Sequence, residues 1–598
     1  MRLVGGNFGM QGEEIGAMRR TKKNSQTKDT TRKKYIFYIG IFFCISLIYV
    51  YVNSYFLVSG ADFDFHTSRI IGLANSLENN HWFPKINYYM ANGLGYGTPM
   101  FYGEWFLYIP AILIGFFNFS VVQSWMALYV CFYTGSLTIL FFTAKKFELS
   151  DFRAFSFSAL IIFNSLMATI VNGAIAFAIC LVLLPLLLYY LYQLFYFEKT
   201  NIAAVSIIAA IIVNTHILST MVVALICLLF FFLNIRRVNG KVMLALMKTI
   251  LLTVGFSAFF LLPLLEQKAS QELIAFHTPN AFRYTSVKGI GTILFNSLND
   301  NVRTISNFPT LSAVGVILLT ATLRKFDMKP SLLRDLSFLI FALIILGSNM
   351  FPWIEFSSSS LGAVQFVGRY LVFALILIIL LSVLNHKIPN YLFVFCIVLT
   401  IFLGISRNTF PDFTTSDNPQ EVIILYNSPE YEQKKLNRYE DLNAMRSGVE
   451  GRSVVLGVSG GEYLNIGADP SNLSTNGEPT IKNGQIVGTD KSYGKIKIQY
   501  TIDNEEKKAE IVVPLLWYKG YVANYSKGAK GSQPNLLLSE TTGKALEDGK
   551  ITLLAEKSGS VEIYYAGTLI QKLSACLSVF LVLLVLTFKI RRKVMTKK

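Results

Sequence analysis

Long apolar runs are the feature of this chain that most restricts its fold. The first run covers about twenty-four residues, from Tyr35 to Val58, which is long enough to cross a bilayer as a helix. Hydrophobic residues make up 53% of the 598 residues and charged residues only 15%, against roughly 25% in soluble domains. Lipid offers the backbone no hydrogen-bond partners, so only helices and closed barrels span it. The runs are continuous rather than alternating, and we therefore expect an all-α polytopic membrane protein.

The positions of the basic residues predict how the chain is oriented. The formal net charge is +17, and the basic residues gather before the first run, after the last run and in short loops. This distribution follows the positive-inside rule, so we expect both termini in the cytoplasm. It also explains the charge without a nucleic-acid partner. About twelve spans, an even number, agree with this orientation.

Composition changes divide the chain into four expected parts. They are a disordered basic cytoplasmic tail (1–34), a transmembrane domain (35–406) with outer loops at 59–120 and 266–308, an extracytoplasmic β-rich domain (407–566), and a last transmembrane helix with a basic cytoplasmic tail (567–598). The third part is polar, and residues 495–500 alternate between charged or polar and apolar side chains. Period-two alternation between turn residues predicts antiparallel strands.

The cysteines and aromatic residues add less specific information. All six cysteines fall in apolar runs without metal-binding spacing, and an outer domain without cysteine suits a Gram-positive bacterium. Aromatic residues of the outer domain either fill its core or form a platform for stacking sugars. They are Trp517, Tyr518, Tyr521, Tyr525, Tyr564 and Tyr565. The sequence leaves both interpretations open.

Titratable residues gather just after the first apolar run. Asp62, His66 and Arg69 have the spacing i, i+4, i+7, which places them on one face if this stretch is helical. A carboxylate beside an imidazole can act as a general base, and Asp62 with Asp64 can bind a divalent cation. The alternative is a solvated helix start, with Asp62 at the positive end of the helix dipole.

Five stretches of the first outer loop resemble a known family. They are Gly60-Ala61-Asp62-Phe63-Asp64-Phe65-His66-Thr67-Ser68-Arg69-Ile70, Trp82-Phe83-Pro84, Asn92-Gly93-Leu94-Gly95-Tyr96-Gly97, Phe101-Tyr102-Gly103-Glu104 and Leu107-Tyr108-Ile109-Pro110-Ala111. Together they resemble the opening of bacterial polytopic proteins labelled "6-pyruvoyl-tetrahydropterin synthase-related", which are related to YfhO-type proteins. This opening is similar to that of glycosyltransferases with the GT-C fold. The resemblance is dense over residues 57–115 and looser to about residue 390.

The resemblance implies a chemistry for the loop. GT-C enzymes carry a catalytic acidic residue in their first outer loop and use polyprenyl-phosphate-linked sugars. Asp62 matches that acidic position and His66 matches the family's histidine. Glu104 stands where the family often has Asp after Phe-Tyr-Pro, and here Gly103 replaces the proline. We therefore expect catalytic roles for Asp62, His66 and Glu104.

Two further polar groups lie at the ends of apolar runs. Asn214 and His216 stand between two runs, where a polar group in lipid is costly and usually functional, although a simple hairpin tip is the alternative. Gln365 and Arg369 belong to a stretch that resembles the Gln-Phe-x-x-Arg of YfhO-type proteins. A guanidinium can bind a phosphate bidentately, or it can snorkel to the interface. We expect these four residues and Arg69 to bind substrate.

The expected function is therefore a membrane glycosyltransferase of inverting mechanism. It would transfer a sugar from a polyprenyl-phosphate-linked donor to a cell-envelope glycan at the outer face of the membrane. A divalent cation is compatible with the loop but is not required by it. The chain has no Walker, GxGxxG, HExxH or GxSxG motif, so ATP-driven transport and protease chemistry lack support. The alternative is a non-enzymatic lipid or polysaccharide transporter or an envelope scaffold.

Overall fold

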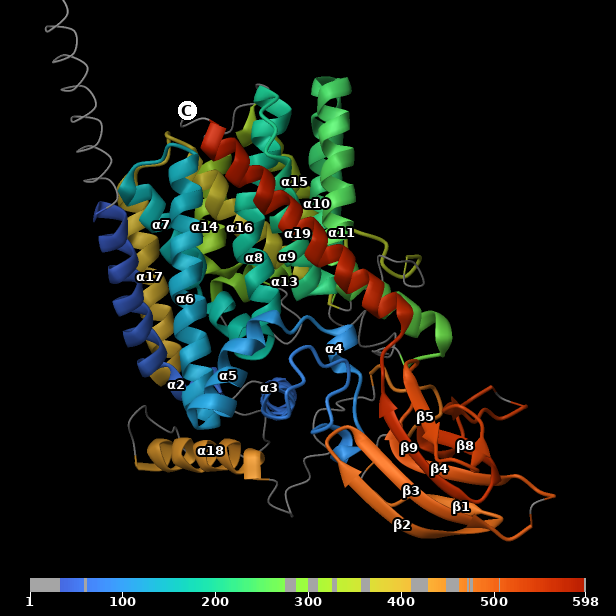
Figure 1. The fold of residues 1–598 in the computed structure, drawn as a ribbon. Helices are drawn as coiled ribbons and strands as arrows, with labels where there is room; N and C mark the ends of the chain where they lie inside the picture. The colour runs from blue at the N-terminus through green and yellow to red at the C-terminus, as the bar shows by residue number, and fades with distance from the viewer. Residues whose placement is uncertain are drawn as a thin grey trace, which may run out of the picture.

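The computed structural model describes most of the chain as a helical bundle joined to a β-rich region. The described residues are 33–58, 62–274, 287–299, 310–324, 331–356, 366–409, 429–447, 462–469, 473 and 477–595, apart from 505 and 542. Figure 1 shows the helices side by side in one body and the strands in a second body at one end of it. We call this end of the bundle the β-proximal end. The predicted tail 1–34 lies almost entirely outside the described residues.

The helices of the bundle are long and apolar. Within the described part of the chain, five are long and apolar enough to cross a membrane: Lys33–Val52, α6 (Val121–Lys146), α8 (Ser165–Phe197), α11 (Gly240–Ser270) and Leu569–Phe588 within α19 (Leu569–Met595). Shorter apolar helices are Trp105–Phe117 (η2 and α5), α9 (Ile202–Thr215), α10 (Ile217–Leu233), α14 (Ser312–Leu323), α16 (Arg369–Leu384) and Asn390–Leu403 within α17 (Asn390–Thr409). Further helices are α2 (Ser54–Leu57), α4 (Thr98–Phe101), α7 (Asp151–Ile162), α13 (Ile290–Asn299) and α15 (Leu332–Leu346). These helices support the predicted multi-pass membrane protein, while the count of about twelve spans stays a prediction.

Two antiparallel sheets form the β-rich region. One contains β1 (Thr480–Lys482), β4 (Ala509–Leu516), β8 (Lys550–Lys557), β6 (Lys530–Gly531) and β7 (Asn535–Leu536); the other contains β2 (Gly484–Ser492), β3 (Lys495–Ile502), β9 (Gly559–Tyr565) and β5 (Tyr521–Tyr525). Along β3, Ile496, Ile498 and Tyr500 are buried and the residues between them are exposed. The predicted β-rich C-terminal region is confirmed, whereas its boundaries stay a prediction.

The aromatic residues of this region fall mostly inside it. Tyr518 and Tyr521 are only 1% and 6% exposed and belong to the core that fills the space between the sheets. Trp517 and Tyr565 are partly buried and pack against the same core. Burial of this much ring surface is a large part of what holds two small sheets together. For these residues the structure favours core packing over a sugar platform.

The β-rich region is held against the bundle by hydrogen bonds and ring packing. The backbone amide of Leu516 donates to the carbonyl of Leu94 at 2.9 Å, which ties β4 to the loop that follows α3 (Phe63–Glu78). The side chain of Gln267 in α11 donates to the carbonyl of Lys519 and accepts from its amide, at 2.8 and 3.0 Å. Through these contacts the region lies against the loop that follows α3 and against α11, at the end of the bundle where Figure 1 shows the strands.

Helix α18 (Pro429–Ser447) lies across the β-proximal end of the bundle (Figure 1). Arg438 forms an ion pair with Asp64 at 2.7 Å, and Leu442 is fully buried in the core of the bundle. The side-chain oxygen of Asn443 accepts from the amide of Val122, the second residue of α6. The helix therefore covers α3 and the start of α6 on the side away from the β-rich region.

Candidate functional site

Helix α3 places three of the predicted residues at the β-proximal end. Asp62 stands at its N-cap position, but its carboxylate makes no capping hydrogen bond, so the helix start does not account for the side chain. The carboxylate is exposed and is surrounded at longer range by protein. This partial loss of water raises the pKa of Asp62, and the positive charge of Arg369 opposes the rise.

Arg69 connects α3 to the loop 102–104. Its Nη1 contacts Nδ1 of His66 at 3.1 Å, and its Nη2 donates to the carbonyl of Gly103 at 2.8 Å. The guanidinium also lies over the rings of Phe65 and Tyr102, at 5.7 and 5.2 Å from their centroids. With 1% exposure, Arg69 is directed at its protein neighbours rather than at open space.

The contact with Arg69 also fixes the state of His66. A guanidinium has no acceptor, so Nδ1 of His66 must accept and Nε2 must carry the proton. Burial, with added repulsion from Arg69 and His216, lowers the pKa of His66 to about 3. His66 is therefore neutral near pH 7 and can offer one N–H donor, but no proton in acid catalysis.

Glu104 faces Arg69 from the loop. Its Oε1 lies 3.5 Å from Nε of Arg69, and the two side chains are 8% and 1% exposed. Burial raises the pKa of Glu104 to about 7, while Arg69 and Lys85 oppose the rise. Lys85 donates to the carbonyl of Phe259 at 3.3 Å, and burial lowers the pKa of its ammonium. Glu104 thus sits in a dehydrated group of charges behind α3.

Gly103 explains how the loop reaches the junction between α9 and α10. A Cβ at this position would lie 1.9 Å from the carbonyl oxygen of Asn214, so no other residue allows this approach of the two backbones. Trp105 then donates to the hydroxyl of Thr215 at 2.8 Å. The side-chain oxygen of Asn214 is buried and has no hydrogen-bond partner among the residues that the structure describes. An unsatisfied buried acceptor is costly, and a bound ligand is one way in which it is satisfied.

His216 separates α9 from α10, because it is the one non-helical residue between them. Its backbone is extended (φ −154°, ψ 105°), and its Nδ1 accepts from the amide of Ser219 as the cap of α10. The capping bond leaves Nε2 as the protonated nitrogen. The imidazole stacks on Phe177 at 6.1 Å, and the guanidinium of Arg369 lies 5.9 Å from the same ring. Phe177 thus contacts both His216 and Arg369.

Arg369 is the first residue of α16, where the helix dipole adds positive charge. It is 9% exposed, and its positive charge opposes the rise in pKa that burial causes at Asp62 and Glu462. Glu462 accepts a hydrogen bond from the hydroxyl of Tyr102 at its carboxylate and another from Tyr96 at its carbonyl. Burial and the charge of Asp62 raise the pKa of Glu462.

The structure therefore brings together most of the residues singled out in the sequence. They are Asp62, His66, Arg69, Glu104, Asn214, His216 and Arg369. Gln365 lies outside the described residues. Asp64 points elsewhere, because its carboxylate pairs with Arg438. No cluster of three or more His, Cys, Asp or Glu side chains that could hold a metal ion occurs in the described part of the chain. The roles of all these residues, and a metal at Asp62 and Asp64, stay predictions.

Glu462 is the site residue that sequence reasoning missed. It lies in the polar outer part, 360 residues from Tyr102, and no spacing rule links the two positions. The only available signal was the pair Glu462-Tyr463 between glycine-rich stretches. Tyr463 stacks on Phe101 at 4.5 Å and 7°, which fixes the segment against the loop.

Known proteins similar to this chain include a bacterial relative and a solved enzyme structure. No family model matches the chain. It is 25% identical, over 97% of its length and all of the relative's, to an uncharacterized protein of Lactococcus lactis subsp. cremoris (strain MG1363). A solved structure of the arabinofuranosyltransferase AftD from mycobacteria is similar over 62% of this chain, with 12% identity and a TM-score of 0.39. This chain spans 26% of that structure's length.

Proposed function

We propose that the chain is a membrane glycosyltransferase of GT-C type, acting at the outer face of the membrane. It transfers a sugar from a polyprenyl-phosphate-linked donor to a cell-envelope glycan. The observation that carries this proposal is an exposed aspartate, Asp62, that lies within electrostatic reach of a cation at a helix N-terminus, Arg369. One group suits an attacking hydroxyl and the other suits a departing phosphate.

Asp62 is proposed as the general base. Its raised pKa makes it a stronger base than an ordinary aspartate, and its carboxylate is exposed to an incoming acceptor. As the acceptor oxygen forms its bond to the anomeric carbon, Asp62 takes the hydroxyl proton. The bond between that carbon and the phosphate oxygen breaks at the same time. A single displacement of this kind inverts the anomeric configuration.

Arg369 is proposed to hold the phosphate. Its guanidinium and the N-terminus of α16 both favour an anion at this point, and charge develops on the phosphate as the bond breaks. His216 can donate from Nε2 to the same phosphate, because its other nitrogen caps α10. The polyprenyl tail would then lie along apolar helix surfaces, with the headgroup at the β-proximal end.

The remaining residues divide into binding and positioning roles. Asn214 offers a buried acceptor for a sugar hydroxyl. Arg69 and Glu104 are proposed to position His66 and Gly103, since their groups are directed at each other and at these neighbours. Glu104 is therefore proposed to position its neighbours rather than to take part directly in catalysis. A divalent cation is not needed for any of these steps.

The rival proposal is a transporter or an envelope scaffold. Transport sites usually lie near the middle of the membrane, on interrupted helices. The charged groups described here lie instead at helix ends and in the loop at the β-proximal end. Their number and chemistry favour a reaction at the membrane surface.

Complementation of a deletion strain tests the proposal. We expect the deletion to remove one sugar from the envelope glycan and to accumulate its lipid-linked donor. The wild-type gene and Asp64→Asn should restore the sugar, because Asp64 is engaged with Arg438. Asp62→Asn at equal expression should not restore it. Restoration by Asp62→Asn would contradict the assignment of the base, and an unchanged glycan with altered lipid distribution would favour the rival.

A further inference from the structure

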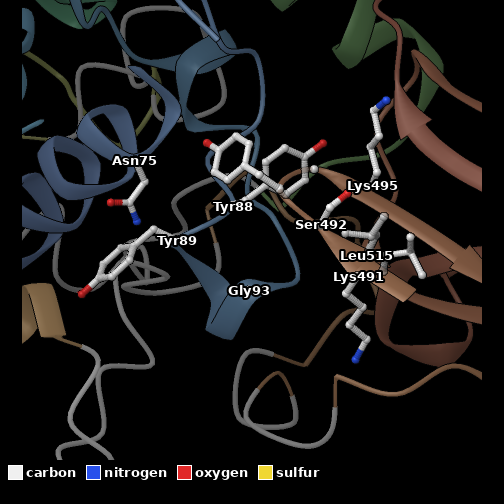
Figure 2. Close-up of a pocket in the computed structure, with 11 residues that line it drawn as sticks. Asn75, Tyr88, Tyr89, Gly93, Lys491, Ser492, Lys495 and Leu515 are labelled. Atoms are coloured by element: carbon white, nitrogen blue, oxygen red, sulfur yellow. The ribbon is translucent and has the colours of Figure 1, made fainter. Parts of the chain in front are cut away.

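We propose that a pocket between α3 and the β2–β3 hairpin binds a hydroxyl-rich segment of the glycan acceptor. The inference rests on the proposed function and deepens it. The pocket has a volume of about 330 Å³, within the range of small-ligand sites. It is lined by Asn75, Tyr88, Tyr89, Gly93, Lys491, Ser492, Tyr493, Gly494, Lys495, Ile496 and Leu515. Figure 2 shows Asn75 and Tyr89 on one side, Ser492 and Lys495 on the other, and Tyr88 between them.

Three tyrosine rings give the pocket its shape. Tyr88, Tyr89 and Tyr493 are all half-buried, and all three line the pocket. Tyr88 and Tyr493 meet edge to face at 5.4 Å. Gly494 adopts a left-handed φ of 70°, and a Cβ there would lie 2.8 Å from the Tyr88 ring. The hairpin tip therefore comes close enough to Tyr88 to build a continuous aromatic wall.

The polar groups of the lining suit hydroxyls better than a phosphate. Ser492 and the Asn75 amide can exchange hydrogen bonds with sugar hydroxyls. The ammonium of Lys491 already pairs with Glu478 at 2.7 Å, and that of Lys495 lies over the Tyr564 ring at 5.4 Å. The lining contains no arginine, which is the residue best suited to phosphate. Ring faces combined with neutral polar groups are typical of carbohydrate recognition.

The position of the pocket connects it with the candidate site. The hydroxyl of Tyr493 forms a hydrogen bond with Ser76 of α3. Burial raises the pKa of this phenol, and the charge of Glu104 adds to the rise. Asn75 lies thirteen positions after Asp62 along α3, which corresponds to about 20 Å at 1.5 Å per residue. That distance exceeds one sugar ring. An acceptor whose terminal hydroxyl meets Asp62 can therefore place its more distant sugars in the pocket.

A binding measurement tests this inference without depending on catalysis. The probe is a size-fractionated, fluorescently labelled oligosaccharide released from the wall polysaccharide of the native host. Binding to the full-length protein in nanodiscs is followed by fluorescence anisotropy. We expect Tyr493→Ala to weaken binding about five- to tenfold, the loss of one aromatic contact, and Tyr493→Phe to retain most of it.

Matched controls separate the outcomes. Lys530 belongs to the same β-rich region but does not line the pocket, and its ammonium pairs with Glu556 at 2.8 Å, so Lys530→Ala should leave binding unchanged. No binding by the wild type, or equal binding by Tyr493→Ala, would overturn the inference. Binding that is retained while sugar transfer is absent would overturn the proposed function alone. Competition by polyprenyl phosphate would reassign the pocket to the donor lipid and would equally overturn it.

Discussion

Glu104→Gln provides a stability test of the charges behind α3. Burial raises the pKa of Glu104 from 4.5 to about 7, even though Arg69 lies 3.5 Å away. This rise corresponds to about 3 kcal/mol against ionising Glu104 in the folded protein. The folded state holds this proton more tightly than the unfolded chain does. Stability is therefore greatest below the unfolded pKa of 4.5, and falls as the pH rises towards about 7.

Glutamine resembles the protonated carboxyl and removes this cost. We expect Glu104→Gln to melt at a higher temperature than the wild type at about pH 8.5, and at the same temperature near pH 4. The assay is thermal unfolding of the full-length protein in detergent, followed by intrinsic fluorescence. Glu78→Gln is the control, because Glu78, the last residue of α3, forms a surface pair with Arg446, and such pairs contribute only about 0–1 kcal/mol.

The opposite result would refute this reasoning. If Glu104→Gln melts lower than the wild type at about pH 8.5, the attraction between Arg69 and ionised Glu104 outweighs the cost of burying it. A difference that persists unchanged near pH 4 would indicate lost packing rather than lost charge. Either outcome would contradict the claim that burial raises the pKa of Glu104 to about 7 and makes its ionisation costly.

Three further predictions follow from the site. Gly103→Ala should lower both the melting temperature and the yield of folded protein, because its Cβ would lie 1.9 Å from the carbonyl oxygen of Asn214. Gly135→Ala is the control and should change neither, because a Cβ at Gly135 would have no atom within 4 Å. Glu462→Gln should reduce sugar transfer without affecting folding, measured in washed membranes, because it removes the negative charge facing Arg369; unchanged transfer would exclude Glu462 from the site. The transfer rate should rise with pH to a plateau, because Asp62 must be ionised to accept a proton. The midpoint of the rise should lie above the pKa of an ordinary aspartate, because burial raises the pKa of Asp62. A rate that falls over this range would exclude Asp62 as the base.

The features that could be predicted from the sequence are those that depend on local patterns. Helical spacing correctly placed His66 and Arg69 near one another on α3, since residues three apart on a helix always meet. Alternation along 495–500 likewise predicted the buried and exposed faces of β3, because strand periodicity is local.

Contacts between distant segments could not be predicted in this way. Glu462 reaches Tyr102 across 360 residues, and Arg438 reaches Asp64 across 374. Both contacts depend on how the β-rich region and α18 are seated on the bundle. The replacement of proline by Gly103 looked like a departure from the family pattern, and only the close approach to Asn214 gives its physical reason.

Helix boundaries inside the apolar runs were similarly hidden. Around Asn164 the sequence is apolar on both sides, and hydropathy alone does not mark a break. The side chain of Asn164 nevertheless accepts from the amide of Leu166 and begins α8, which continues through a kink at Ala174 to Phe197. A single capping hydrogen bond therefore marks the start of α8, which hydropathy does not reveal.

Sugar transfer by the purified protein is the most direct test of the central claim. The full-length protein in nanodiscs is incubated with lipid-linked sugars and wall oligosaccharides extracted from the native host. Release of polyprenyl phosphate and the anomeric configuration of the new bond are measured by mass spectrometry and NMR. We expect release by the wild type with inversion at the anomeric carbon, and none by Asp62→Asn. Release by Asp62→Asn at the wild-type rate, or retention of configuration, would contradict the account.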